Sequence, residues 1–515
     1  MGSASPSTEH TVGGDVASWI GRGGPWGGTL VPERIDTHAA SVFLAGDRAW
    51  KLKRPVKLPY LDFSSVDLRH GALEAELRLN RRTAPKLYLA LHKVTLSPSG
   101  ALRLDGDGDA VDWLLEMQRF PEGALLADQV EHGTLADAAV MQLADHLAHF
   151  HEEAESSRNS GGAARLRKVA KGNAARLAAY PELFDSRQVG ALTTEIAAMI
   201  ERNAALLDLR SLSGRVRRGH GDLHLGNIAM IDGSATPFDC LEFDEELATA
   251  DVLYDLAFLL MDLWHRGARR AANMLFNRYL DVSADEGGAG LLPLFMSVRA
   301  TVRAHVMAAT FQRSGSTKAA SAARDFLILA QALLGGATPV VVAIAGLSGT
   351  GKTTLAREIG ADVGGAPGAR ILRSDVLRKR LAGLAPETSL PPSCYNQRET
   401  GRVYAELTRL TGHWVGAGSG VVADAVFGQA AEKRAIELVA QQQQVPFHGF
   451  WLDLAEEARL ARIRDRGPDA SDATVAVAQR QSADLRLGPN GWSVLPAGTD
   501  IASLAATIRE TVSRA

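Results

Sequence analysis

Residues 346–353 read GLSGTGKT and match the phosphate-binding pattern G-x-x-x-x-G-K-[ST] at every fixed position. The apolar run VVVAIA (340–345) precedes them, and TTLAREIG (353–360) follows. A buried strand, a glycine-rich turn and a helix are therefore expected in this order. The glycines let backbone N–H groups face an anion, and the helix N-terminus adds a partial positive charge. The stretch predicts a nucleotide-binding loop at the start of a parallel α/β sheet.

The side chains of this loop suit a nucleoside triphosphate with its magnesium ion. Lys352 can reach the β- and γ-phosphates, and Thr353 can bind Mg²⁺. The predicted cofactors are therefore ATP or GTP, and Mg²⁺. The residues predicted to contact the nucleotide are Gly346, Ser348, Gly349, Thr350, Gly351, Lys352, Thr353 and Thr354.

A possible acceptor site follows at RILRSDVLRKRLAG (370–383), where a strand is expected to end at Ser374 and Asp375 before a basic helix. In open α/β sheets the carboxyl ends of strands hold the ligands. Asp375 is therefore predicted to accept the proton of an acceptor hydroxyl, or to orient it. Arg378, one turn further, is predicted to hold the acceptor or a phosphate. The alternative is that Asp375 only caps the helix.

Two later segments add charged groups to the same site. The strand GVVADAVF (420–427) carries Asp424, which is predicted to bind Mg²⁺ through water or to hold the acceptor; a turn aspartate is the alternative. The segment RLARIRDRG (459–467) brings Arg462, Arg464 and Arg466 before a Gly-Pro break. Arginines on a lid can close on the nucleotide's transferring phosphoryl group. A solvated basic face is the alternative.

Residues 340–515 resemble the predicted kinases allied to polynucleotide 5′-hydroxyl kinases, zeta-toxin-like kinases and gluconate kinase. The resemblance is carried by the phosphate-binding loop, the Asp375-x-x-Arg378 element, Asp424 and the arginine segment. It implies a P-loop kinase that phosphorylates a hydroxyl group.

A second, independent pattern lies at residues 220–227, HGDLHLGN, with the spacing H-x-D-x-x-x-x-N. This is the spacing of a kinase catalytic loop. Asp222 is predicted to take the proton of an acceptor hydroxyl, and Asn227 to bind Mg²⁺. Asp239, after Phe238 at the end of a short strand, is predicted to be the second metal ligand. A transition-metal site built on the two histidines of the motif is the alternative.

The motif H-G-D-L-H-x-G-N resembles aminoglycoside phosphotransferases and choline-kinase-like enzymes, over roughly residues 31–330. The resemblance implies an α+β bilobal fold of the protein-kinase type, in which a strand lysine that binds ATP pairs with a helix glutamate. Lys51, at the end of a strand, and Glu76 are the predicted pair, with Lys53 and Glu74 as alternatives. No G-x-G-x-x-G pattern precedes Lys51, which is a departure from protein kinases.

The acidic stretch after Asp239 is a further candidate, because members that modify aminoglycosides present acidic residues to a cationic substrate. A solvated turn is the favoured interpretation of this stretch. Asp251 and Asp255, further on, resemble the family's structural aspartates and are predicted to be buried hydrogen-bond acceptors. The acidic stretch consists of Glu242, Asp244, Glu245 and Glu246.

Composition limits the remaining function classes. The formal net charge of the 515-residue chain is −3, which argues against wholesale binding to nucleic acid or anionic membranes. Its two cysteines, Cys240 and Cys394, stand outside paired motifs, so neither a disulfide framework nor a zinc site is expected. Residues 1–10 lack the pattern of a signal peptide, and no apolar run reaches the roughly 18 residues of a membrane span. A cytoplasmic protein without a membrane partner is expected.

The predicted organisation has four segments, with GGATP (335–339) as the main boundary. They are an N-terminal arm at 1–30, a kinase-like N-lobe at 31–120, a helical C-lobe with the catalytic loop at 121–336, and a P-loop kinase domain at 338–515.

The predicted function is a bifunctional ATP-dependent phosphotransferase that transfers the γ-phosphate to hydroxyl groups of small molecules, such as sugars, amino sugars or aminoglycoside-like compounds. In the alternative, only the P-loop module is catalytic, and the N-terminal module is a regulatory or substrate-binding pseudokinase. An enzyme of aminoglycoside resistance is a third hypothesis. A polynucleotide acceptor stays open for the P-loop module, although the net charge gives it no support.

Overall fold

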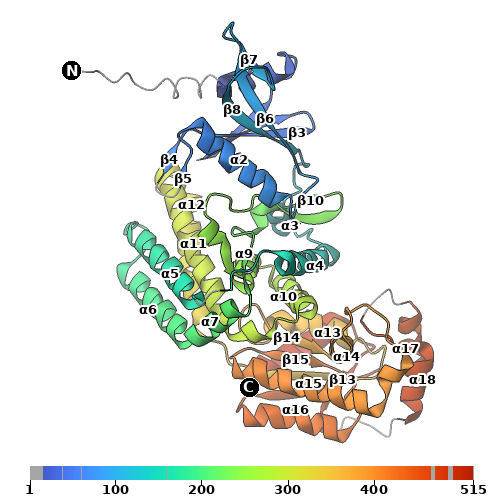
Figure 1. The fold of residues 1–515 in the computed structure, drawn as a ribbon. Helices are drawn as coiled ribbons and strands as arrows, with labels where there is room; N and C mark the ends of the chain where they lie inside the picture. The colour runs from blue at the N-terminus through green and yellow to red at the C-terminus, as the bar shows by residue number, and fades with distance from the viewer. Residues whose placement is uncertain are drawn as a thin grey trace. The chain divides into compact units, whose positions relative to one another are not determined.

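The structure is a computed structural model that describes residues 16–37, 39–58, 61–158, 161–465, 470–484 and 491–513 (Figure 1). The chain divides into two compact units. The first unit consists of Met1–Leu135, Glu153–Ser157 and Val216–Ala250, and the second of Ala136–Glu152, Arg158–Arg215 and Asp251–Ala515. The second unit therefore joins most of the predicted helical C-lobe to the P-loop segment. The division into four segments stays a prediction.

The first unit is built on a six-stranded antiparallel sheet in the order β1-β2-β3-β8-β6-β7, and one helix, α2 (Val66–Asn80), contacts β6 and β8. The strands are β1 Glu33–Asp36, β2 Ala40–Ala45, β3 Arg48–Lys53, β6 Tyr88–Leu96, β7 Leu102–Leu104 and β8 Ala110–Gln118. A separate pair is formed by β4 (Lys57–Leu58) and β5 (Leu61–Asp62).

Gly46 and Asp47 stand between two apolar runs and form the turn of a hairpin. β2 and β3 pair antiparallel from Ala45 opposite Arg48, and Gly46 has φ 61°, which a tight hairpin turn requires. The sequence placed Lys51 at the end of this strand, but β3 continues to Lys53. Because side chains alternate along a strand, Lys51 and Lys53 project from the same face of the sheet.

The sheet has an apolar cluster on each of its two faces. One contains Phe43, Trp50 and Leu114, together with Val16 and Ile20, which are fully buried and come from the helical residues 16–21. This described part of the predicted arm therefore belongs to the core. The other cluster includes Leu73 of α2 and Leu115 of β8, and so fixes α2 on the sheet.

The catalytic-loop segment of the first unit is irregular: a loop leads into a short hairpin. β10 (Ile228–Ile231) pairs antiparallel with β11 (Ser234–Pro237) around Asp232 and Gly233, which both have positive φ. The other elements here are α3 Leu126–Glu131, β9 Val216–Arg218, η2 Leu225–Asn227, α8 Glu245–Ala248 and β12 Thr249–Asp251.

The second unit begins with a group of helices in which α11 contacts α5, α9 and α12. Asp251 caps α9 and accepts two bonds from Arg210 (2.7 and 2.8 Å), and Asp255 lies 3.2 Å from His151. Both aspartates are buried hydrogen-bond acceptors, as predicted. The helices are α4 Asp137–Glu153, α5 Gly162–Ala178, α6 Ser186–Arg202, α7 Ala204–Leu212, α9 Val252–His265, α10 Arg269–Ser283, η3 Glu286–Leu291, α11 Leu292–Ser314 and α12 Thr317–Leu334.

The same unit contains a five-stranded parallel sheet in the order β14-β15-β13-β16-β17, flanked by helices (Figure 1). Its strands are β13 Val341–Gly346, β14 Arg370–Arg373, β15 Val421–Asp424, β16 Phe447–Asp453 and β17 Ser493–Pro496. Its helices are α13 Lys352–Ile359, η4 Gly360–Asp362, α14 Ser374–Leu381, η5 Pro392–Tyr395, α15 Gln397–Gly416, α16 Ala430–Gln442, α17 Glu456–Arg464, α18 Val475–Asp484 and α19 Ile501–Ser513. Val342, Ile344, Leu355 and Ile508 form part of its core.

The two predicted fold classes are thus observed: an antiparallel sheet with one packed helix, and a later parallel α/β sheet. Among the described residues, no helix is both long enough and apolar enough to cross a membrane.

Candidate active sites

Two lysines and three carboxylates form a connected cluster in the first unit. Lys51 Nζ lies 2.6 Å from Glu76 Oε1 and 2.8 Å from Asp239 Oδ1. Lys53 Nζ lies 2.7 Å from Glu76 Oε2 and 2.6 Å from Glu242 Oε1. Glu76 therefore bridges both lysines, and Lys51 is the one that also reaches Asp239.

The charges of this cluster stabilise one another. Burial disfavours the charged form of Lys51, but Asp239 and Glu76 raise its pKa well above the usual value. Burial also disfavours the Asp239 carboxylate, yet attraction to Lys51 keeps the pKa of Asp239 below its usual value. Asp239 is therefore an anion at neutral pH. Its side chain is 43% exposed, so a cation can approach it.

The backbone at Asp239 adopts a conformation that is rare for a residue other than glycine, with φ 61°. Two side chains hold it. The Asp239 N–H donates to the Tyr88 hydroxyl (3.1 Å), and the Cys240 N–H donates to Asn80 Oδ1 (2.8 Å). Such a fixed, sparsely populated conformation is typical of functional sites.

The HGDLHLGN loop is held by its own side chains. Asn227 Nδ2 donates to the carbonyl oxygen and to Oδ2 of Asp222, both at 3.0 Å. His224 accepts the Gly226 N–H at Nδ1 (3.1 Å), and its Nε2 lies 3.5 Å from Asp222 Oδ2. The fully buried His220 donates from Nε2 to the Phe238 carbonyl (2.9 Å). Because this nitrogen bonds to the backbone just before Asp239, His220 helps to position Asp239.

The residues present fit a magnesium–nucleotide site. Because Asn227 donates through its amide nitrogen, its Oδ1 is the oxygen left to accept or ligate. With the Asp239 carboxylate it supplies the hard oxygen donors that Mg²⁺ prefers. Lys51 lies beside Asp239 and can face a phosphate.

The acidic stretch differs from the predicted solvated turn at one position. Glu242 is buried and paired with Lys53, whereas Asp244 caps α8 by accepting the Leu247 N–H (2.9 Å). The sequence missed the Glu242–Lys53 pair because the partners are far apart in the chain.

The GLSGTGKT loop of the second unit requires its glycines. Gly349 has φ 87°, and a Cβ at this position would lie 2.6 Å from the Arg459 carbonyl oxygen. A Cβ at Gly346 would lie 2.7 Å from the Leu452 carbonyl oxygen. Lys352 Nζ donates to the Leu347 carbonyl (3.0 Å), so the ammonium group lies across the loop. A glycine-rich loop before a helix N-terminus can hold the phosphates of a nucleotide.

Thr353 and Asp424 meet at the carboxyl edge of the parallel sheet. Thr353 Oγ1 donates to Asp424 Oδ2 (2.6 Å), and Arg373 Nε lies 3.7 Å from the same oxygen. Asp424 is the last residue of β15, which is shorter than the strand predicted over 420–427. A hydroxyl and a carboxylate together fit a magnesium ion beside the phosphate loop.

Asp375 interacts electrostatically with Arg373, Asp424 and Lys352. The strand ends at Arg373, earlier than predicted, so Asp375 occupies the first turn of α14; the N-cap is Arg373, not Asp375. Burial raises the pKa of the Asp375 carboxyl and the charge of Asp424 adds to this, against the opposing effects of Arg373 and Lys352. Burial likewise lowers the pKa of Lys352. A carboxylate with a raised pKa is a stronger general base than an exposed one.

Arg378 contacts the segment that follows its own helix. Its Nη1 donates to the Cys394 carbonyl (2.9 Å) and lies 3.4 Å from Thr400 Oγ1, and its guanidinium lies 4.9 Å from the Tyr395 ring centroid. Arg378 therefore ties α14 to η5 and the start of α15.

Arginines of α17 contact the phosphate-binding loop. Arg462 donates to the carbonyls of Thr350 (3.2 Å) and Ala497 (3.1 Å), and Arg459 donates to that of Ser348 (3.3 Å). Arg459 is not one of the residues predicted from the sequence, although it stands one helical turn before Arg462. Arg464 is exposed, and the predicted Arg466 lies outside the described residues.

Ser471 and Asp472 are two further residues of this region that the sequence pattern did not predict. A hydrogen bond from Ser471 partly offsets the raised pKa of Asp375. Asp472 accepts from Lys379 Nζ (3.0 Å) and from the Tyr395 hydroxyl (2.5 Å). Both residues belong to an irregular segment, where no periodic pattern singles them out.

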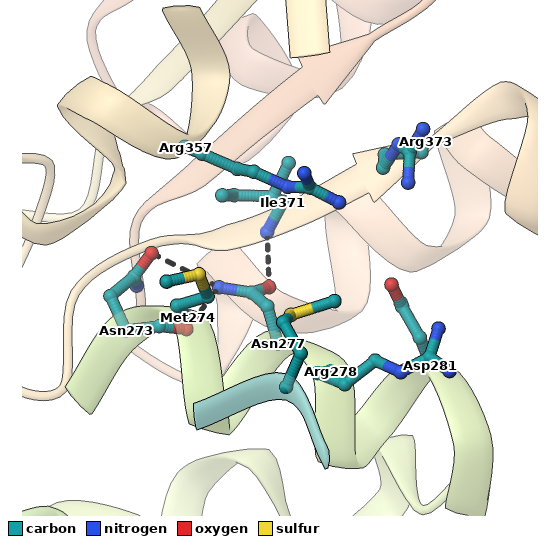
Figure 2. A pocket seen from close by; sticks show the side chains of 9 residues that line it. Asn273, Met274, Asn277, Arg278, Asp281, Arg357, Ile371 and Arg373 are labelled. Carbon is teal, nitrogen blue, oxygen red and sulfur yellow. Dashed lines mark hydrogen bonds between the residues drawn. The ribbon is translucent and has the colours of Figure 1, made fainter. Parts of the chain in front are cut away.

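A pocket lies between α10 on one side and β14 with α13 on the other (Figure 2). Figure 2 shows Arg357 and Arg373 across it from α10, and Asn277 pointing toward Ile371. Its lining is Met141, Asn273, Met274, Asn277, Arg278, Asp281, Arg357, Ile371 and Arg373.

The two folds with their sites define a kinase-like phosphotransferase domain followed by a P-loop domain. The model of the "Phosphotransferase enzyme family" matches residues 68–292, and that of the "AAA domain" matches residues 341–487. These matches confirm the predicted resemblance and fold classes, and they support a small-molecule kinase type of function.

The chain is 30% identical over 456 residues to Rv2004c of Mycobacterium tuberculosis (strain ATCC 25618 / H37Rv), covering 87% of this chain and 89% of the relative. Mb2027c of Mycobacterium bovis (strain ATCC BAA-935 / AF2122/97) gives the same values. The chain therefore belongs to the same family as these mycobacterial proteins.

Solved structures similar to each part include two kinases. A Plasmodium vivax ethanolamine kinase is 11% identical with TM-score 0.38, covering 59% of this chain and 82% of its own. A Sinorhizobium meliloti gluconokinase is 17% identical with TM-score 0.26, covering 34% of this chain and 93% of its own.

Proposed function

We propose that the chain is a bifunctional phosphotransferase, with one Mg²⁺–nucleotide site in each unit and hydroxyl groups of small molecules as acceptors. One recurring arrangement carries the proposal: in each unit a lysine that can bind phosphate shares a charge cluster with a carboxylate suited to a cation. In the first unit these are Lys51 and Asp239 (2.8 Å). In the second they are Lys352 and Asp424, which interact electrostatically.

In the first unit, Asp222 takes the proton of the acceptor hydroxyl, and the Asn227 amide orients its carboxylate. Lys51 holds phosphate oxygens, and Glu76 fixes the lysine in that position. Asn227 and Asp239 would hold a magnesium ion, which would supply positive charge next to the phosphate oxygens. The acceptors proposed here are sugars, amino sugars or aminoglycoside-like alcohols.

In the second unit, Asp375 takes the proton of the acceptor, for which its raised pKa suits it. Lys352 and the loop N–H groups hold the phosphates, and Arg462 lies close enough to the loop to join them. Thr353 and Asp424, whose side-chain oxygens lie 2.6 Å apart, would hold the magnesium ion. ATP or GTP is the proposed phosphoryl donor.

Separate inactivation of the two sites tests the proposal. The full chain is assayed for Mg²⁺-dependent nucleoside diphosphate release against a panel of sugars, amino sugars, aminoglycosides and nucleosides. We expect Asp222→Asn to abolish transfer to one class of acceptor, by a factor of about 10³ or more, and Lys352→Ala to abolish transfer to another.

Each variant serves as the control for the other, since each leaves one site intact. If Asp222→Asn changes no activity while Lys352→Ala removes all of it, the first unit is a pseudokinase. If neither substitution affects any turnover, the proposal is wrong.

A further inference from the structure

One buried carboxylate in η3 connects three elements of the parallel sheet region. Glu286 Oε1 accepts from Arg370 Nη2 (2.9 Å) and from Arg380 Nη1 (2.7 Å). Its Oε2 accepts from Trp414 Nε1 (2.7 Å). These donors belong to β14, α14 and α15 respectively. The Glu286 side chain is 10% exposed and Arg370 is 1% exposed, so the charge pair is withdrawn from water.

The three connected elements surround the proposed acceptor side of the P-loop site. α14 carries Asp375 in its first turn and Arg378 one turn later. Arg378 in turn contacts Thr400 on α15 (3.4 Å). Arg380, on the same short helix, also donates to the Leu280 carbonyl at the end of α10 (2.8 Å). The placement of α14 thus depends on partners that precede the P-loop segment in sequence.

Glu286 is itself anchored in the helical part of the second unit. Its neighbour Asp285 accepts two bonds from Arg210, at 2.7 and 2.8 Å. Arg210 also binds Asp251, the N-cap of α9. Because Arg210 holds the neighbouring Asp285, Glu286 can hold Arg370 and Arg380 at defined positions.

Helix α10 adds a second attachment, at the edge of the sheet (Figure 2). β14 is an edge strand, so part of its backbone has no neighbouring strand. Asn277 Oδ1 accepts the Ile371 N–H (2.7 Å), and Asn273 Nδ2 donates to the Ala369 carbonyl (2.9 Å). The asparagines replace a missing strand and fix β14 just before Asp375.

We infer that Glu286 is a positioning residue of the P-loop site, and that through Arg380, Arg370 and Trp414 it holds the helix that carries the proton acceptor Asp375. The inference rests on the proposed function of that site. It makes the helical segment before the P-loop domain part of the acceptor site.

Substitutions in the full chain, measured in two ways, test this role. Arg380→Gln removes the bond from α14 to Glu286 together with the bond to the Leu280 carbonyl, and it leaves Glu286 with Arg370 and Trp414. Glu286→Gln removes the charge of the carboxylate and leaves the Arg380–Leu280 bond in place. Hydrogen exchange is followed by mass spectrometry for the peptides covering 374–381 and 346–356. We expect exchange in α14 to accelerate at least tenfold in both variants, with the phosphate-loop peptide unchanged within twofold.

The second measurement separates acceptor from nucleotide. For any acceptor whose phosphorylation depends on Lys352, KM for the acceptor should rise at least tenfold, while affinity for Mg²⁺–nucleotide stays within twofold. A purely structural role would instead lower the active fraction and the nucleotide affinity together. Glu406→Gln is the matched control, because it breaks an ion pair with Arg409 (2.7 Å) on the surface of α15.

Unchanged α14 exchange in folded Arg380→Gln and Glu286→Gln proteins overturns the inference. So does equal acceleration in both peptides. Exchange needs no acceptor, so it decides the positioning role even if no Lys352-dependent transfer is found, a result that would contradict the proposed function instead.

Discussion

At the residue scale, the phosphate-binding loop depends on a glycine that no other residue can replace without displacing backbone. The Cβ of an alanine at Gly349 would lie 2.6 Å from the Arg459 carbonyl oxygen, and φ is 87°. The contact is with backbone of α17, which cannot move aside as a side chain can. The phosphate-binding loop and α17 therefore pack too closely at Gly349 to leave room for a Cβ atom.

We expect Gly349→Ala to weaken Mg²⁺–nucleotide binding at the second unit at least tenfold, because the loop must open or α17 must shift. Calorimetric titration of the full chain should then show one nucleotide site in place of two. Gly401→Ala is the control: nothing lies within 4 Å of a Cβ at this position on α15. Replacing an exposed helix glycine should stabilise the chain by about 0.5–1 kcal/mol and leave binding unchanged. Retention of both sites in Gly349→Ala would show that the steric argument is wrong.

At the scale of elements, Glu286 joins η3 to β14, α14 and α15, and its ionisation links this junction to pH. Burial opposes the charge of the Glu286 carboxylate, but Arg370 and Arg380 lower its pKa to about 2. In the unfolded chain the pKa is about 4.3. The contribution to stability is therefore complete above about pH 5 and is lost as the pH falls toward 2.

Between pH 5.5 and 3.5 this single group should reduce the free energy of unfolding by about 1 kcal/mol. In the Glu286→Gln variant no carboxylate is present at this position to be protonated. The variant should therefore be less stable at neutral pH and should lose less stability on acidification. Urea unfolding at the two pH values measures the difference, with Glu406→Gln again as control. Parallel pH profiles for wild type and Glu286→Gln would contradict the assignment.

At the scale of the whole molecule, the second unit combines helices of the kinase-like part with the entire parallel sheet. Arg370 of β14 is buried, and its side-chain partners Asn277, Asp281 and Glu286 all precede the P-loop segment. A chain beginning at residue 338 would lack those acceptors and would expose the edge of β14 that α10 and η3 cover.

We expect residues 338–515 alone to be unstable or insoluble, although the matched AAA domain spans 341–487. Residues 251–515, which keep α9, α10 and η3, should be more stable than the shorter fragment. Thermal unfolding followed by circular dichroism distinguishes the two. A cooperative transition of 338–515 within a few degrees of the longer fragment would mean that the module folds independently.

The sequence by itself determined the elements with strong local signals. The GLSGTGKT loop, the turn at Gly46 and Asp47 and the catalytic-loop spacing are all encoded within a few neighbouring residues. Hydrophobic period and turn chemistry act over this range, so the parallel α/β class of the P-loop part was predictable from them. The bilobal class of the first part followed from the family resemblance. The pairing of Lys51 with Glu76 followed from a family resemblance, and the structure places their atoms 2.6 Å apart.

Only the tertiary structure decided which distant charges meet. Lys53 with Glu242, Arg459 with the phosphate loop, and Glu286 with Arg370 and Arg380 are joined by folding across long separations. No periodicity marks such pairs, because burial and charge complementarity are properties of the assembled core and not of a local stretch. For the same reason the breaker cluster GGATP is a loop between α12 and β13 but does not divide the compact unit that spans it.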